Sequence, residues 1–186
     1  MDAQARKKYD EVGPEPAQWH AKGTAKKNNS NAQTDKNCAK KKAKKKPDFV
    51  ALPVGKNVFF LLDCETTGSK RNWDRGIEYC VIAYDKDGKL LDHFFSRVSN
   101  GGVRIKPSAH AVHGISYRDL RDAPTFDVVG RKMNQFFTRV LQNFDSGVLV
   151  AHNGSTDFQF LSCDYIRAGL TMPTKITHTL CTLQSM

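Results

Sequence analysis

No apolar segment of this 186-residue chain is long enough to cross a bilayer. The N-terminus begins Met1-Asp2-Ala3-Gln4 and has no apolar signal core, so we do not expect secretion. The five cysteines are odd in number and none forms a C-x-x-C pair, which argues against a disulfide framework and favours a reducing compartment. The sequence therefore predicts an intracellular protein with no membrane partner.

Branched apolar residues are also scarce in the first 47 residues. This segment carries twelve Lys and one Arg against five acids, a net charge of +8, whereas residues 48–186 carry a net charge of +2. Its polar stretches show no helical or strand period. We expect residues 1–47 to form a disordered basic tail and residues 48–186 to form one folded domain.

The charge of this tail indicates a polyanionic partner, most simply the phosphate backbone of nucleic acid. The run from Lys40 to Pro47 matches a nuclear-import signal equally well. Both interpretations stay open at this point. The second leads us to expect a nuclear location before a cytoplasmic one.

The folded part centres on the stretch from Val58 to Gly68. Five apolar residues, 58–62, run directly into Asp63, Cys64 and Glu65, which predicts a strand buried on both faces. Alternate side chains of a strand share a face, so Asp63 and Glu65 would project together while Cys64 faces away and only packs. Two adjacent carboxylates favour Mg²⁺ or Mn²⁺ over Zn²⁺ between them. The alternative is a solvated turn, because a bare Asp-x-Glu triplet also occurs by chance.

The pattern of apolar and turn residues gives the remaining elements. It predicts strands at about 58–64, 77–84, 89–98, 147–151 and 174–180, and helices at about 116–120, 125–143 and 156–168. Asp87-Gly88 is a hairpin signal between the second and third strands. This order predicts an α/β domain in which a mixed sheet of about five strands carries helices on its faces.

A third acid, Asp157, falls in the first turn of the last predicted helix, directly after a predicted strand. Three segments now stand in a recognisable order: Leu62–Gly68, Ala111–Ile115 and Val150–Phe158. Together they resemble the motifs of the DnaQ-like (DEDD, in particular DEDDh) 3′–5′ exonucleases, which have a ribonuclease-H-like fold. Two departures are Thr156, where the family usually has an aromatic residue, and Cys181, where it usually has Asp.

The resemblance implies hydrolysis of phosphodiester bonds at the 3′ ends of DNA or RNA, with release of nucleoside 5′-monophosphates. It implies two divalent ions, Mg²⁺ or Mn²⁺, with Asp63, Glu65 and Asp157 as catalytic and metal-binding residues. It places Thr66, Thr67, His113 and Asn153 against the terminal nucleotide. For His113 and His152 a purely structural, hydrogen-bonded role is the alternative. A polymerase or a second copy of the chain is a further partner that we consider.

The family's third motif has no match. That motif is a general-base His followed about five residues later by Asp or Tyr on a final helix. Here His178 is the last histidine and no acid follows it, so this chain has no general-base His and its C-terminal helices are missing. We expect a fragment of a complete exonuclease, or a truncated product without activity. The alternative function is a nucleic-acid-binding module that keeps the fold and not the chemistry.

Overall fold

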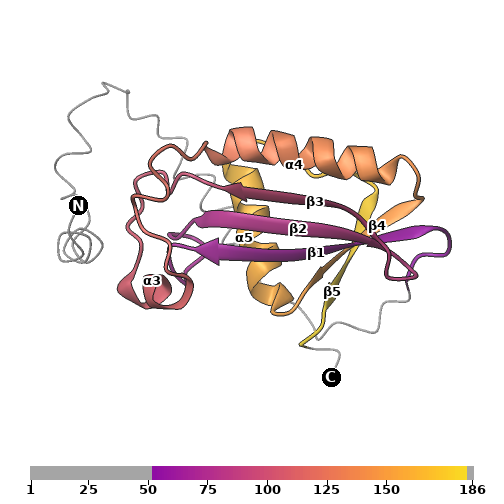
Figure 1. Ribbon diagram of the computed structural model, residues 1–186, viewed down its shortest axis with the longest axis horizontal. Helices are drawn as coiled ribbons and strands as arrows, with labels where there is room; N and C mark the ends of the chain where they lie inside the picture. Colours follow the sequence, from indigo (N-terminus) through magenta and orange to yellow (C-terminus); the bar gives the residue numbers. More distant parts are fainter. Residues whose placement is uncertain (1–51, 184–186) are drawn as a thin grey trace.

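A five-stranded mixed sheet forms the centre of the computed structural model, which describes residues 52–183 (Figure 1). The strand order is β3-β2-β1-β4-β5. The strands are β1 (Asn57–Thr66), β2 (Gly76–Asp85), β3 (Leu90–Arg97), β4 (Ser146–Ala151) and β5 (Ile176–Cys181). Five strands and the α/β class are as the sequence predicts, whereas the tail boundary predicted at residue 47 lies outside the described residues.

Strand β1 lies in the middle of the sheet and has a neighbouring strand on each side. It pairs with β2 antiparallel and with β4 parallel, so that Phe60 stands between Ala83 and Leu149. Hairpin β2–β3 closes as predicted: the Asp85 carboxylate accepts hydrogen bonds from the N–H groups of Asp87 and Lys89, and Gly88 takes a positive φ of 77°. The end of β1 is thereby held in the middle of a rigid sheet.

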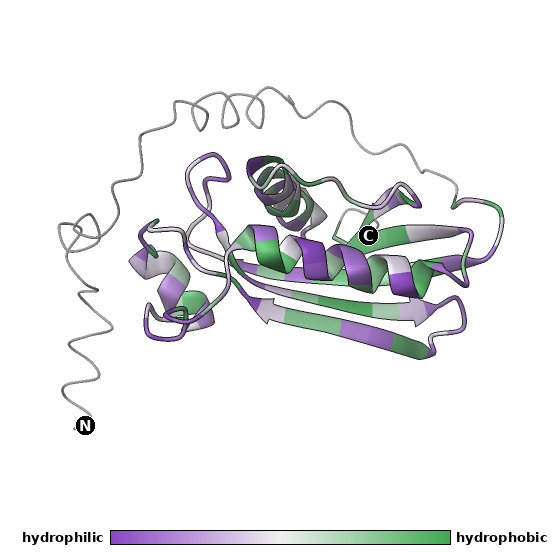
Figure 2. Cartoon of the chain, turned by 90° about the horizontal axis from the view of Figure 1, so that it is seen from above, coloured by the Kyte–Doolittle hydropathy of each residue, from purple (hydrophilic) through white to green (hydrophobic). Residues whose placement is uncertain are grey.

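Helices α4 (Phe126–Leu141) and α5 (Gly154–Arg167) cover one face of this sheet (Figures 1 and 2). Both helices share one apolar core with the inward-facing residues of β1 and β2. The Phe60 ring meets the edge of the Phe137 ring at a centroid distance of 4.9 Å. On the opposite face Leu61 remains 41% exposed, so the helices of the described region cover a single face.

One short helix, α3 (Pro107–His113), lies where the sequence shows no period. Proline at its first position starts it, and Gly114 at φ 70° ends it. None of its seven residues is buried, so it has no apolar stripe that could reveal it. The helix predicted at 116–120 is wrong: the Ser116 N–H and hydroxyl both donate to Asp119 and form a turn.

The segment that carries α3 is attached to the rest of the domain by its own small apolar cluster. Ile105, Ile115 and Leu120 pack around Ile77 at the start of β2. This packing places α3 beside the carboxyl end of β1 (Figure 1). No helix in residues 52–183 is long and apolar enough to span a membrane.

Candidate active site

Acidic side chains gather where β1 ends. Asp63 and Glu65 alternate with Leu62 and Cys64, which pack into the helix-covered core, so the two acids leave β1 on the open face as predicted. A register shift between Glu65 and Thr66 follows immediately. The bulge ends regular pairing next to the acids, which is a common way to aim side chains at a site.

Asp157 approaches the same strand from the helix side. It lies in the first turn of α5, is only 7% exposed, and accepts a hydrogen bond of 3.3 Å from the Cys64 thiol through its Oδ1. The prediction that Cys64 only packs is therefore wrong. Cys64 does face away from Asp63 and Glu65, but its Sγ touches the third predicted acid.

The negative charges of these acids oppose one another. Burial raises the pKa of Glu65, and the charges of Asp63, Glu78 and Asp157 raise it further. Burial also raises the pKa of Asp157, with a contribution from Asp63, while the Cys64 hydrogen bond works in the opposite direction. A bound cation would relieve this repulsion.

Glu78 is an acidic neighbour that the sequence reasoning missed. It stands directly opposite Glu65 in the β1–β2 pairing, where two like charges destabilise the pair of strands. Arg97 compensates from β3, with Nε 3.2 Å from a Glu78 carboxylate oxygen. The register of the first two predicted strands decides which residues face each other, so pairing these strands would have placed Glu78 opposite Glu65.

The donor chemistry of this site suits a divalent cation with a preference for oxygen ligands. In residues 52–183, however, no three His, Cys, Asp or Glu side chains converge closely enough to hold a metal ion. The residues therefore fit a divalent cation in their charge and in the type of ligand atom. Asp63 and Glu65 would supply the carboxylate oxygens, and Asp157 would add negative charge nearby.

The two threonines after the acids differ in their surroundings. Thr66 is partly exposed and its hydroxyl donates to the Gly68 carbonyl at 2.9 Å. Thr67 is fully buried: its Oγ1 accepts the Arg75 N–H at 3.0 Å and lies 3.4 Å from Asp74 Oδ1. Thr66 is thus placed at the surface beside the acids, whereas the side chain of Thr67 holds the loop between β1 and β2.

Buried Asp74 organises this loop and was also missed by the sequence reasoning. It is 2% exposed, and its Oδ2 lies 2.6 Å from the Lys106 ammonium and 2.7 Å from the Lys70 N–H. A Cβ at Gly68 would lie 2.7 Å from this same Oδ2, so only glycine fits between. Asp74 and Lys106 therefore clasp the β1–β2 loop to the start of α3.

His113 closes the same region from the other end of α3. Its Nδ1 accepts the Ile115 N–H at 2.9 Å, so the proton resides on Nε2, which donates to the Thr66 carbonyl at 3.2 Å. Burial lowers the pKa of His113. Both ring nitrogens are engaged inside the chain, and His113 lies beside Thr66.

Asn153 and His152 lie at the entrance to α5. Asn153 is the N-cap residue; its backbone carbonyl accepts the Thr156 N–H and its side-chain oxygen accepts the Ser155 hydroxyl. His152 is exposed and its Nδ1 lies 3.0 Å from the Thr182 hydroxyl. Asn153 thus sets the first turn of α5, which carries Asp157.

Comparison with known proteins identifies exonucleases as relatives of this chain. Residues 60–186 match the family model described as "Exonuclease" (RNase T). A "DNA polymerase III subunit epsilon-like protein" of Rhodobacter capsulatus is 30% identical over 110 residues, which cover 59% of this chain and 15% of that protein. This chain therefore spans a small part of the length of that relative.

Solved structures of exonucleases share the fold. E. coli exonuclease I in complex with a dT13 oligonucleotide superposes with a TM-score of 0.54 and 16% identity, over 61% of this chain and 24% of that chain. The nuclease domain of 3′hExo, a DEDDh family member bound to rAMP, gives a TM-score of 0.52 and 17% identity, over 63% of this chain and 62% of that one. The likeness confirms the ribonuclease-H-like fold.

Proposed function

We propose that this chain, which belongs to the DnaQ-like family of 3′–5′ exonucleases, uses its folded domain to hydrolyse the terminal phosphodiester bond at the 3′ end of a nucleic-acid strand. The products would be a nucleoside 5′-monophosphate and a strand shortened by one nucleotide. The observation that carries this proposal is the group of mutually repelling acids around the carboxyl end of β1, where Glu65 and Asp157 both have raised pKa values.

Asp63 and Glu65 would hold a divalent cation, Mg²⁺ or Mn²⁺, with Asp157 close by. Such an ion, when bound, supplies a Lewis acid for the phosphodiester and lowers the pKa of a bound water; two ions remain our proposal for the complete site. Cys64 orients the Asp157 carboxylate through the 3.3 Å hydrogen bond. The Asp74–Lys106 clasp holds Thr66 at the surface where the terminal nucleotide would lie.

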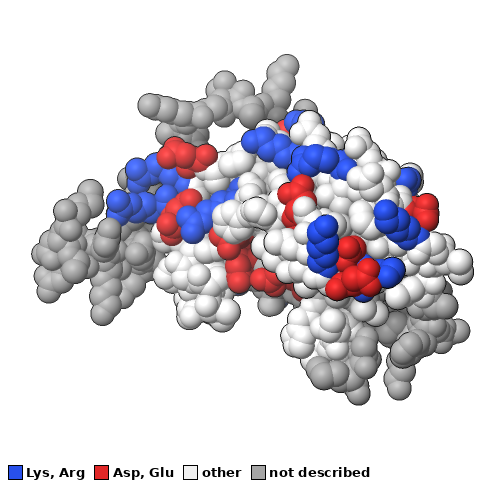
Figure 3. Space-filling model, turned by 45° about the vertical axis from the view of Figure 1, so that its right-hand side comes forward, with Lys and Arg blue, Asp and Glu red and all other residues white. Residues whose placement is uncertain are grey.

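Nucleic acid is the substrate class that the structural neighbours support. One neighbour holds a DNA oligonucleotide and another holds a ribonucleotide. On the face seen in Figure 3, acidic and basic side chains occur in small mixed groups and not as one basic surface. We propose that the basic residues before position 48 add affinity for the phosphate backbone or bind an import receptor. The name of the Rhodobacter relative makes a polymerase a candidate partner.

The decisive experiment is a cleavage assay with the purified chain, a 5′-labelled oligonucleotide of DNA or of RNA, and Mg²⁺ or Mn²⁺. We expect progressive shortening from the 3′ end that Asp63→Asn abolishes. Asp87→Asn is the matched control, because Asp87 is an exposed acid in the β2–β3 turn, where it pairs with Lys86. Shortening that is equal in wild type and Asp63→Asn would contradict the assignment.

The second candidate is a binding module that retains the fold without the chemistry. One observation favours it: the part of the chain that the structure describes holds no group of three metal-ligating side chains. This candidate predicts oligonucleotide binding in EDTA and no cleavage with either cation. Cleavage that depends on Asp63 would exclude it.

A further inference from the structure

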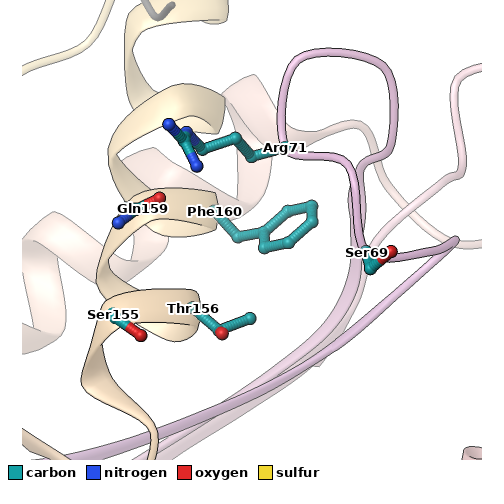
Figure 4. A pocket seen from close by; sticks show the side chains of 6 residues that line it. All are labelled: Ser69, Arg71, Ser155, Thr156, Gln159 and Phe160. Carbon is teal, nitrogen blue, oxygen red and sulfur yellow. The ribbon is translucent and has the colours of Figure 1, made fainter. Parts of the chain in front are cut away.

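A polar pocket of about 220 Å³ lies between the β1–β2 loop and the first two turns of α5 (Figure 4). Its lining residues are Ser69, Arg71, Ser155, Thr156, Gln159 and Phe160. Figure 4 shows the Arg71 side chain reaching from the loop toward Gln159 on the helix. Thr156 immediately precedes Asp157 in the first turn of α5, and Ser69 follows Glu65 by four residues.

The pocket is built on a fixed frame. The loop that carries Arg71 is tied down twice, because the Lys70 N–H donates to buried Asp74 and the Arg71 carbonyl accepts from the Arg167 guanidinium. Arg167 is itself paired with Asp164, which is 3% exposed. The backbone of the loop and α5 therefore keep their spacing, while the Arg71 side chain points into the space between them.

The lining selects an anion. It offers three hydroxyl groups, one amide and one guanidinium, and it contains no carboxylate. Arg71 forms no ion pair with any acid in residues 52–183. Arginine together with hydroxyl and amide donors is a common way for proteins to bind phosphate oxygens.

Thr156 keeps this pocket open. The Thr156 side chain is exposed and lines the pocket. An aromatic ring there would project into the volume that the small threonine leaves empty.

We infer that this pocket binds a phosphate of the substrate strand on the 5′ side of the bond that is cleaved. The inference rests on the proposed function, which brings a 3′ end to Asp63, Glu65 and Asp157. A terminal nucleotide with a free 3′ hydroxyl carries no further phosphate on that side. Any phosphate other than the scissile one must therefore belong to the 5′ part of the strand.

The test measures binding in EDTA, where cleavage plays no part, with a short 5′-fluorescent oligonucleotide and the full chain. A single neutral methylphosphonate replaces each of the linkages nearest the 3′ end in turn. For the wild type we expect one position to weaken binding by about fivefold, the loss of one partly exposed charge-assisted contact. Arg71→Gln should weaken binding of the unmodified strand to a similar extent and remove the sensitivity to that linkage.

Two further variants sharpen the result. Thr156→Phe fills the pocket from an exposed position and should also remove the sensitivity. Arg139→Gln is the matched control, because the Arg139 guanidinium pairs with Asp92 between α4 and β3 and does not line the pocket. A thermal melt of each variant should show an unchanged fold. A methylphosphonate profile that is the same in Arg71→Gln and wild type would overturn the inference.

Cleavage separates this inference from the proposed function. The p-nitrophenyl ester of thymidine 5′-monophosphate has one phosphodiester and no upstream phosphate, so Arg71→Gln should raise KM for the oligonucleotide by a larger factor than it changes kcat/KM for this ester. An equal loss on both substrates would place Arg71 at the scissile phosphate and overturn the inference. If nothing is cleaved but the methylphosphonate effect depends on Arg71, the proposed function fails and the phosphate pocket stands.

Discussion

The Cys64 thiol and the Asp157 carboxylate are hydrogen-bonded at 3.3 Å although they lie 93 positions apart in the sequence. This bond joins the central strand to the first turn of α5. It stabilises the charged form of Asp157, since it acts against the rise in pKa that burial causes. The bond therefore sets both the position and the charge of one acid of the candidate site.

Replacing Cys64 should lower activity without unfolding the domain. Cys64→Ala removes the donor to Asp157, so we expect kcat to fall by roughly threefold to tenfold through loss of orientation. Cys64→Ser keeps a donor and should retain most of the activity. Cys80→Ala, which removes a thiol from the neighbouring strand, is the control. Equal activity of Cys64→Ala and wild type would show that the bond is dispensable.

Neutralising Glu65 should stabilise the domain when metal is absent. Folding raises the pKa of Glu65 above its ordinary value of 4.5, so the folded state disfavours the carboxylate above that pH. In EDTA near neutral pH we expect Glu65→Gln to unfold at higher denaturant concentration than wild type. The difference should vanish as the pH falls below 4.5, where Glu65 is protonated in both states. A Glu65→Gln variant less stable than wild type at neutral pH would refute this explanation.

Breaking the Asp74–Lys106 clasp should loosen the loop that presents Thr66. Asp74→Asn leaves Lys106 without its carboxylate; because the Lys106 side chain is 38% exposed, we expect a loss of only about 1–3 kcal/mol in unfolding free energy. KM for an oligonucleotide should rise more than kcat falls. The double variant Asp74→Asn/Lys106→Met should recover part of the stability. If the losses of stability caused by Asp74→Asn and by Lys106→Met alone simply add up in the double variant, a direct interaction between the two side chains is contradicted.

Acidification should weaken the C-terminal end of α3 through His113. Burial lowers the pKa of this imidazole below 6.5, so the bond that neutral Nδ1 accepts from the Ile115 N–H stabilises the fold at higher pH and is lost as the pH falls below 6.5. The bond from Nε2 to the Thr66 carbonyl is available to both forms of the ring. We expect wild type to exceed His113→Gln in stability near neutral pH and to lose that margin as the pH falls below 6.5. The measurement is denaturant-induced unfolding of both proteins at several pH values, and a margin that does not change with pH would contradict this explanation.

Removing residues 1–47 should change how salt affects binding. If the basic tail contacts phosphates, its deletion should flatten the plot of log affinity against log salt by at least about one unit. The measurement is oligonucleotide binding in EDTA at several salt concentrations, with the intact chain as reference. An unchanged slope would leave import as the remaining role of the Lys40–Pro47 run.

The sheet and the long helices could be predicted from the sequence, because buried faces of strands and helices repeat apolar residues at a regular spacing. The run 58–62 before Asp63 became β1, and the apolar stripe of 125–143 became α4 within two residues at the C-terminal end. Helix α3 escaped because no buried face marks it. The roles of Asp74 and Glu78 were not predicted, because each depends on a partner distant in sequence. Asp74 pairs with Lys106 and Glu78 pairs with Arg97 only in the folded chain.

The acids of the site come from two layers. Asp63 and Glu65 leave β1 on its open face, while Asp157 comes from α5, which packs against the other face. A cation bound near them would attract acids from both layers at the carboxyl end of β1 and so link β1 to α5. Amide protons of β1 and of the first turn of α5 would then exchange with solvent as one cooperative unit, so that occupancy of the site governs the local opening of both layers.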